Sequence, residues 1–164
     1  MNAAAPLAER VRAAMRRTAS GVTVLATDGP GGRSGVTIST LCSLSLEPPS
    51  VIACLHRDSR TIAPVVTNGV FSANILAEGQ SDIAAVFAGL DPAYQNDRFA
   101  IGVWHVADSV PRLQGAVASF ACRLAARHEF GTHVILIGEI YAVAATGRAP
   151  LIYADRVFQS LPAA

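Results

Sequence analysis

Short stretches in which apolar and β-branched residues alternate recur along this chain, and they constrain its fold more than any other feature. They are GVTVLAT (21–27), SGVTIS (34–39), SVIACL (50–55), VFSANIL (70–76) and THVILIGEIYAVAAT (132–146). Alternation with a period of two residues is typical of half-buried strands. Six or so short strands with few helices between them do not fit a doubly wound α/β sheet. They predict a mainly β fold, an antiparallel barrel or sandwich with helices packed outside it.

The segments around these strands divide into helices, turns and one irregular stretch. Apolar residues at helical spacing (Leu7, Val11, Ala14, Met15) predict an opening helix that ends near 20–21. DGPGG (28–32) is a turn that joins the first two strands into a hairpin. A short helix is expected over 61–68, and Pro64 limits it to about one turn beyond its start. A second helix is expected over 81–89 with Ser81 as N-cap, followed by an irregular stretch over 90–113. The stretch 116–130 is expected to be a strand rather than a helix, and Gly138 a bulge or a site of close approach.

Composition and charge exclude several classes of protein. The chain has 164 residues, 51% hydrophobic and only 15% charged, and this apolar excess suggests a surface buried against a partner subunit. A net charge of +1 without a basic run argues against nucleic acid as a partner. The apolar stretches are strand-sized, so no membrane span is expected, and the N-terminus lacks the apolar core of a secretory signal.

The cysteines and histidines do not indicate a metal site. Cys42, Cys54 and Cys122 are widely spaced within apolar sequence, which is typical of buried reduced thiols and fits a cytoplasmic protein. The histidines are not spaced as ligands, so no metal is predicted.

The stretch from Thr37 to Ser45 contains six short hydroxyl or thiol side chains and no charge. The chain has no lysine, and GPGG is followed by a strand pattern, so neither a P-loop nor a dinucleotide-binding fingerprint is present. Short hydroxyls and backbone N–H groups can still hold phosphate in a neutral nest. The alternative is a β-hairpin edge whose Ser and Thr satisfy backbone groups, and spacing alone favours that alternative.

An ordered set of motifs resembles the short-chain flavin reductases, the NAD(P)H:flavin oxidoreductase components of two-component monooxygenases. The set is ASGVTVLAT followed by T-x-S-T-x-x-S-x-S-x-x-P-P, then ACLHRDSRT, GVFSANIL, VFAGLD, DRF, GAVASFACRL, GTHVILIGEI and PLIYADRVF. The match spans roughly 15–158. The resemblance implies a split β-barrel of the Greek-key, FMN-binding type with a few peripheral helices. It implies one domain over 1–164, with an N-terminal helix in 1–20 and the barrel core in 21–158.

The same resemblance implies a homodimer that binds FMN or FAD near its interface, takes NADH or NADPH as reductant, and supplies reduced flavin to a partner oxygenase. Backbone N–H groups over 38–42 would face the flavin ring, and the hydroxyls of Thr37, Ser39, Thr40 and Ser43 would bond its edge, ribityl chain and phosphate. The full set of implied flavin residues is Thr37, Ile38, Ser39, Thr40, Leu41, Cys42, Ser43, Cys54, Ser59, Arg60, Thr61, Ala88 and Gly89. Arg60 would supply the cation for phosphate, and Cys54 has packing as its other interpretation.

On the nicotinamide side the resemblance points to His133 as the candidate catalytic residue, with further contacts from Tyr153 and Arg156. Thr132 stands where the family motif has Asp, a departure that weakens the orientation of the imidazole. It leaves room for an alternative, a non-enzymatic split barrel that binds flavin, haem or another flat ligand. A third interpretation is reduction of a flavin-linked substrate such as a corrinoid by the same fold.

Overall fold

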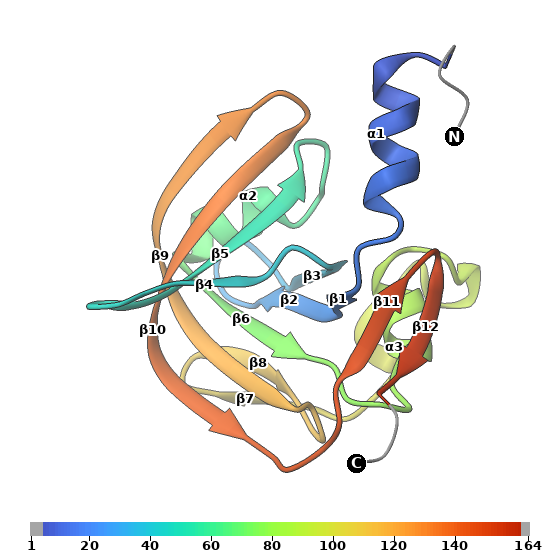
Figure 1. Cartoon of the computed structure of the whole chain (residues 1–164). Helices are drawn as coiled ribbons and strands as arrows, with labels where there is room; N and C mark the ends of the chain where they lie inside the picture. Colours follow the sequence, from blue (N-terminus) through green and yellow to red (C-terminus); the bar gives the residue numbers. More distant parts are fainter. Residues whose placement is uncertain (1–4, 162–164) are drawn as a thin grey trace.

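The computed structural model describes residues 5–161, and its central feature is a seven-stranded antiparallel sheet. The strand order is β3 (Ser34–Ile38), β2 (Thr23–Thr27), β6 (Val70–Ile75), β9 (Ala118–Phe130), β10 (His133–Ala145), β5 (Pro49–His56) and β4 (Cys42–Leu46). The long strands β9 and β10 bend strongly along their length (Figure 1). This arrangement confirms the prediction of a mainly β protein.

The sheet curls into a barrel because its two outer strands are consecutive in the sequence. Only residues 39–41 separate the end of β3 from the start of β4. The four Cα–Cα steps from Ile38 to Cys42 span at most about 15 Å. In a flat sheet of seven strands the outer strands would lie about 29 Å apart. The sheet therefore has to bring its edges together, and the open seam between β3 and β4 is the split of the barrel (Figure 1).

Alternation along the strands builds two cores, one inside the barrel and one outside it. Leu25 on β2 points inward, whereas its neighbours Val24 and Ala26 pack on the outer face. The inner core consists of Leu25, Ile38, Val51, Ala53, Leu55, Ile62, Val65, Phe71, Cys122, Val134 and Leu136. The outer core consists of Val22, Val24, Ala26, Leu76, Ile83, Ala84, Val86, Phe87, Leu113, Ala116 and Leu151. Because both faces of β2 are covered, every residue of this strand is buried.

Smaller elements surround the barrel. They are α1 (Leu7–Met15), α2 (Ile62–Asn68), α3 (Ser81–Phe87), the 3-10 turns η1 (Pro92–Tyr94) and η2 (Arg98–Ala100), the hairpin β7 (Trp104–Ala107) with β8 (Val110–Leu113), and a three-stranded sheet of β1 (Ser20–Gly21), β11 (Leu151–Ala154) and β12 (Val157–Ser160). The helix α1 stands away from the barrel and has no buried residue (Figure 1). No helix within 5–161 is long and apolar enough to cross a membrane.

Most of the predicted elements are confirmed. The turn at 28–32 joins β2 and β3 into an antiparallel hairpin, 116–130 is a strand, and α2 and α3 lie within the expected ranges. The register between β10 and β9 shifts at Gly138, which confirms the predicted bulge. A Cβ atom there would lie 2.4 Å from Cζ of Phe71, so the predicted close approach is confirmed as well.

Several sequence predictions are wrong in detail. The opening helix ends at Met15, because Ser20 and Gly21 pair with β11 as strand β1. Pro64 does not shorten α2 to one turn: it lies in the first turn, where its missing N–H has no intrahelical partner anyway. The N-cap of α3 is the residue before Ser81, and no side chain caps it.

The stretch 90–113 contains the hairpin β7–β8 in addition to the two 3-10 turns. Its turn is made by Asp108 and Ser109, with φ of 51° and 62°. Glycine and asparagine are the usual signals of such a turn, and this one has neither. The strand β4 lies at the edge of the sheet and forms an antiparallel hairpin with β5, as the hairpin-edge interpretation of this Ser-rich stretch predicted.

Asn74 is fully buried in β6 and uses both ends of its amide to hold the barrel together. Its Nδ2 donates to the Val24 carbonyl at 3.2 Å and to Ser72 Oγ at 2.9 Å. Its Oδ1 accepts from the backbone N–H of Leu113 at 3.0 Å and from Ser119 Oγ at 2.8 Å. These hydrogen bonds give Asn74 a structural role in the barrel.

Replacing Asn74 with alanine is expected to lower the free energy of unfolding by about 3 kcal/mol. The substitution leaves the Leu113 N–H and the Ser119 hydroxyl without their buried acceptor. Thermal unfolding followed by circular dichroism measures the effect. Asn96→Ala, at an exposed asparagine, serves as the control and should leave Tm unchanged. Equal Tm values for Asn74→Ala and the wild type would contradict this role.

Candidate functional site

The larger pocket, about 710 Å³, opens where four segments meet beside the split of the barrel. The segments are the start of β3, the loop between β5 and α2, the end of α3, and the stretch through η2. Its lining consists of Arg33, Ser34, Gly35, Val36, His56, Asp58, Ser59, Arg60, Thr61, Phe87, Ala88, Gly89, Gln95, Asn96, Asp97, Arg98 and Phe99. Pockets of this size hold molecules as large as many cofactors.

Hydrogen bonds between these segments fix the shape of the larger pocket. Ser34 Oγ on β3 lies 3.0 Å from Thr61 Oγ1 at the start of α2. The guanidinium of Arg98 donates to the Phe87 carbonyl at 3.1 Å, at the end of α3. Gly35 allows this packing, since a Cβ atom there would lie 2.6 Å from the Phe87 ring. The walls are therefore built before any ligand binds.

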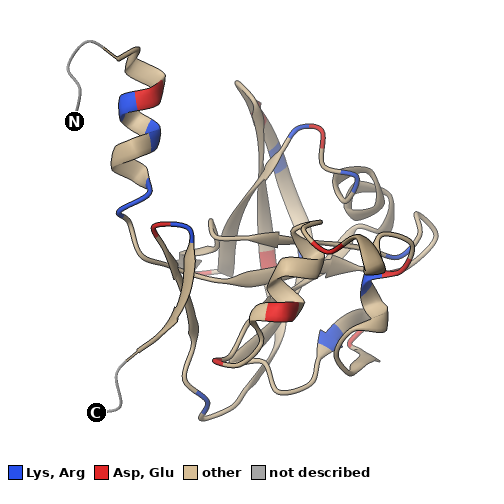
Figure 2. Ribbon diagram, turned by 90° about the vertical axis from the view of Figure 1, so that its right-hand side faces the viewer, with Lys and Arg blue, Asp and Glu red and all other residues tan. Residues whose placement is uncertain are grey.

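Cationic groups outnumber carboxylates around the larger pocket. Three arginines line it against two aspartates. Figure 2 shows that charged residues lie mostly in loops and on α1, whereas the barrel strands carry few. Arg98 is engaged with backbone carbonyls, which leaves Arg33 and Arg60 as the guanidinium groups able to reach a ligand. Guanidinium and hydroxyl donors together are the groups that bind phosphate.

A smaller pocket of about 350 Å³ lies where β9 ends and β10 begins. Its lining is Cys54, Phe130, Gly131, Thr132, His133 and Ile135. His133 on β10 pairs in register with His56 on β5, and the two rings meet edge to face with centroids 5.4 Å apart. His56 lines the larger pocket and His133 the smaller one, so this histidine pair forms the boundary between them.

The imidazole of His133 is oriented by its neighbour in the chain. Thr132 Oγ1 lies 2.9 Å from His133 Nδ1. A hydroxyl can donate to this nitrogen or accept from it, unlike a carboxylate, which only accepts unless protonated. The replacement of the family Asp by Thr132 therefore preserves a partner for the ring without adding a charge.

The predicted flavin residues fall into three groups in space. Ser59, Arg60, Thr61, Ala88 and Gly89 meet in the larger pocket, although α2 and β6 separate the two sets in the sequence. Cys54 lines the smaller pocket together with His133. The seven residues from Thr37 to Ser43 line neither of these two pockets and lie at the split of the barrel.

Within that third group several side chains already have protein partners. Thr37 Oγ1 donates to the Ala84 carbonyl at 2.7 Å, which ties β3 to α3. Thr40 Oγ1 donates to the Cys54 carbonyl at 2.9 Å and accepts from the Cys54 N–H at 3.1 Å. Ile38 is buried in the inner core, and Leu41 packs against it. The hydroxyl protons of Thr37 and Thr40 are thus engaged within the protein, whereas Ser39, Cys42 and Ser43 are exposed.

Tyr153 and Arg156 lie on the hairpin of β11 and β12, outside both pockets. Tyr153 packs against Phe158 with ring centroids 5.2 Å apart. Arg156 occupies the turn of that hairpin with φ of 68°. The structure does not bring these two residues to His133 within one chain.

Twelve of the seventeen residues that line the larger pocket were not predicted as site residues, and Arg33, His56, Arg98 and Phe99 are among them. The DRF motif contains the last two of these four, and Asp97 of that motif caps η2 by accepting from the Phe99 N–H at 2.9 Å. Asp97 therefore serves as the N-cap of η2. Arg33 follows the turn at 28–32 and carried no sequence signal of its own.

The three cysteines are free and differ in environment. Burial raises the pKa of Cys122 to about 12. Burial, and to a lesser extent the neighbouring Cys42, also raises the pKa of Cys54. The thiol beside His133 therefore stays neutral at physiological pH, and it adds an apolar surface to the smaller pocket.

At pH 8, a disulfide reagent such as DTNB is expected to modify exposed Cys42 rapidly and Cys122 only after unfolding. With its pKa near 12, only about one Cys122 thiol in ten thousand is ionised at that pH, and the thiolate is the nucleophile. Stopped-flow absorbance of the released thiolate measures the phases. Cys42→Ser should remove the fast phase, and fast modification of Cys122 in the native protein would contradict this assignment.

Comparison with known proteins decides the family. The model described as "Flavin reductase like domain" matches residues 15–162. The chain belongs to this family. FMN reductase (NADH) RutF 1 from Methylorubrum extorquens is 42% identical over 166 residues, which cover 99% of this chain and 82% of that protein. The resemblance seen in the sequence motifs is thereby confirmed.

Two solved structures of flavin reductases share the fold. The Streptomyces globisporus C-1027 NADH:FAD oxidoreductase SgcE6, in complex with NAD and FAD fragments, has a TM-score of 0.87 at 26% identity, covering 95% of this chain and 93% of that chain. The styrene monooxygenase flavin reductase SMOB from Pseudomonas putida S12 has a TM-score of 0.82 at 25% identity, covering 93% and 97%. The split-barrel fold predicted for this flavin reductase is confirmed.

Proposed function

We propose that this chain is an NADH-dependent flavin reductase that acts on FMN. The observation that carries the proposal is the contact between His56 and His133, which joins a cationic, hydroxyl-lined pocket to a smaller pocket beside Cys54. One pocket suits the phosphate and sugar of a flavin, and the other suits a planar uncharged ring. FMN and NADH are preferred over FAD and NADPH because the relatives from Methylorubrum extorquens are named FMN reductase (NADH).

The donor set of the larger pocket fits a flavin phosphate. Ser59 and Thr61 offer hydroxyls, and Arg60 supplies a guanidinium that makes no ion pair among residues 5–161. Ala88 and Gly89 border the pocket without side chains that could block it. These five residues would hold the phosphate end, and the backbone over 38–42 would hold the ring at the split of the barrel.

His133 would contact the nicotinamide of the reductant. Its ring is held by Thr132 and by the edge of His56, so that it can orient a bound ring without reorganisation. Roles for Tyr153 and Arg156 toward the same substrate rest on the sequence motif alone.

The flavin, once bound, supplies the hydride acceptor, so the protein needs no carboxylate pair or nucleophile. The chain itself positions two flat rings and shields them from water. Proximity of this kind provides much of the acceleration in a transfer between bound partners. The neutral thiol of Cys54 and the side chain of Ile135 would give a bound ring an apolar surface beside His133.

We further propose that the protein is a cytoplasmic homodimer that passes reduced flavin to an oxygenase. Large apolar side chains remain exposed on the edge strand β4 and at the β9–β10 turn, with Leu46 82% and Phe130 83% exposed. Such a surface suits burial against a second copy. The relative SMOB is named for styrene monooxygenase, which supports an oxygenase as the acceptor here. The three free cysteines support a reducing compartment.

Steady-state kinetics with both flavins and both nicotinamides test the proposed function. Oxidation of NADH that depends on FMN, with a higher kcat/KM than any other pairing, is the expected result. A protein that binds flavin but oxidises neither NADH nor NADPH would be a non-enzymatic binding module instead. A higher kcat/KM with FAD would overturn the choice of FMN.

A further inference from the structure

We propose that Arg33 selects FMN over FAD by covering the ring of Phe99 while it offers donors to a terminal phosphate. This inference rests on the proposed function and adds the residue that sets flavin specificity. Both side chains line the larger pocket, and neither was part of the predicted site.

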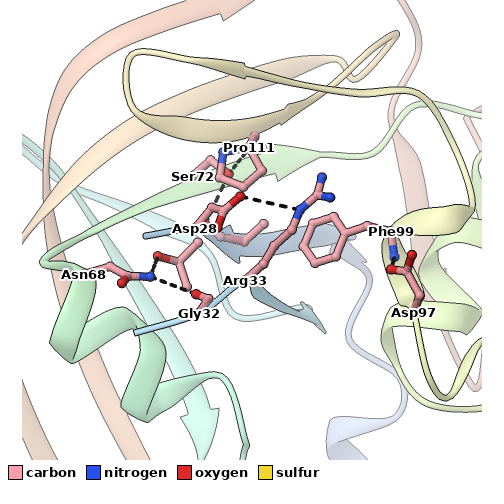
Figure 3. A network of polar contacts seen from close by, with 10 residues as sticks. Asp28, Gly32, Arg33, Asn68, Ser72, Asp97, Phe99 and Pro111 are labelled. Atoms are coloured by element: carbon pink, nitrogen blue, oxygen red, sulfur yellow. Dashed lines mark hydrogen bonds and ion pairs between the residues drawn. The ribbon is translucent and has the colours of Figure 1, made fainter. Parts of the chain in front are cut away.

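The guanidinium of Arg33 lies over the ring of Phe99. Its Cζ atom is 4.0 Å from the centroid of the ring, and its Nε lies 3.8 Å from Asp28 Oδ2 (Figure 3). The side chain keeps 41% exposure, so the guanidinium is accessible from the pocket although it has two partners. Among the hydrogen bonds of residues 5–161, none involves its two Nη groups, which leaves them for a ligand.

The loop that carries Arg33 is held in place by Asn68 at the end of α2. The Asn68 side chain donates to Thr27 Oγ1 at 2.9 Å and to the Gly32 carbonyl at 3.0 Å (Figure 3). Its Oδ1 accepts from the Gly31 N–H at 2.6 Å. This anchoring fixes the backbone next to Arg33. The Arg33 side chain therefore extends from a backbone whose position is held by Asn68.

Phe99 is fixed from its other side. Its ring meets Phe87 and Trp104 edge to face, with both centroid distances at 5.0 Å. The backbone N–H of Phe99 donates to Asp97 Oδ1 at 2.9 Å (Figure 3). With those neighbours behind it, the ring presents a face to the pocket, and Arg33 lies on that face.

FMN and FAD differ at the phosphate end of the ribityl chain. FMN ends in a phosphomonoester, which carries between one and two negative charges at neutral pH because its second pKa is about 6. In FAD the two phosphates are joined by an anhydride bond and each carries a single charge, and an adenosine is attached to the second one. Adenine binds more tightly where it can stack on an exposed aromatic ring.

Arg33 acts on both differences in the same direction. Its unused Nη groups favour the more highly charged terminal phosphate of FMN. Its guanidinium occupies the ring face on which an adenine would stack, because cation and base compete for the same surface of Phe99. Asp28 pairs with Nε at 3.8 Å, on the part of the guanidinium that the phosphate does not need.

Flavin fluorescence quenching gives dissociation constants for FMN, FAD and riboflavin without turnover. In Arg33→Ala, the Kd for FMN is expected to rise about tenfold, which corresponds to the loss of about 1.4 kcal/mol. The Kd for FAD should stay within about twofold or fall, because the uncovered ring offsets the lost charge. The Kd for riboflavin, which has no phosphate, should be the same in Arg33→Ala as in the wild type.

Two further variants sharpen the test. Arg33→Lys keeps the charge and loses the planar stack, so FMN binding should persist while FAD binding tightens. Arg127→Ala removes another exposed arginine, one that pairs with Glu129 and lines neither pocket, and should change no Kd.

An equal rise in the Kd values for FMN and FAD in Arg33→Ala would overturn the inference. A larger rise for FAD would also overturn it, because it would mean that adenine stacks on the guanidinium. Either result leaves the proposed reductase activity standing if the wild type still reduces FMN. A wild-type protein that binds no flavin would overturn both proposals.

Discussion

Replacing His133 with alanine is expected to raise the KM for NADH by about tenfold, while the KM for FMN changes less than about twofold. His133 lines the smaller pocket with Cys54, whereas the phosphate-binding groups lie across the histidine pair in the larger pocket. Removing the imidazole therefore takes away a contact to one substrate and leaves the other in place. Initial rates at saturating FMN and varied NADH give the KM for NADH, and rates at saturating NADH and varied FMN give the KM for FMN.

A control for this substitution is available on the neighbouring strand. His128→Ala removes an exposed histidine of β9 that lines neither pocket, and both KM values should stay at the wild-type level. If His133→Ala raised both KM values equally, the assignment of His133 to the nicotinamide side would be wrong.

Replacing Gly138 with alanine is expected to lower the free energy of unfolding by about 3 kcal/mol. The new Cβ atom would lie 2.4 Å from Phe71 Cζ and 2.9 Å from Cys122 Cβ, both inside the barrel. Strand β10 pairs with β9 on one side and β5 on the other, so its backbone has little freedom to recede. For a chain of this size the Tm should fall by about 10 °C.

Gly147 provides the matched control for Gly138. A Cβ atom at Gly147 would meet no heavy atom within 4 Å, so Gly147→Ala should leave Tm unchanged. Shortening the opposing ring with Phe71→Leu should recover part of the stability lost in Gly138→Ala, because the clash is local. A Gly138→Ala protein as stable as the wild type would show that the bulge does not depend on glycine.

The strands of this fold could be predicted where alternation and turn residues agree. The hairpin of β2 and β3 was expected from two alternating stretches joined by DGPGG, and its five paired positions confirm it. The hairpin of β7 and β8 has no such signal, because a turn of Asp108 and Ser109 with positive φ lacks the usual glycine. The closing of the sheet depends on the pairing order of distant strands, which local sequence does not encode.

In the candidate site, too, features that follow from sequence motifs could be predicted, whereas features that depend on tertiary packing could not. The segments around Ser59 and around Gly89 were expected to share a ligand from the family motifs, and they do line one pocket. The stacking of Arg33 on Phe99 depends on the packing of the β2–β3 turn against η2, and no periodicity or motif reports such a contact. Thr37 and Thr40 looked like ligand donors in the sequence, yet their hydroxyls donate to backbone carbonyls of α3 and β5.

The central claim is that this one chain brings a flavin and a nicotinamide together across the histidine pair. The most direct test is anaerobic stopped-flow mixing of NADH with equal concentrations of protein and FMN, monitored by the visible absorbance of the flavin. We expect rapid bleaching that saturates with NADH and forms one NAD⁺ for each FMN reduced. Bleaching no faster than in the absence of protein would contradict the claim.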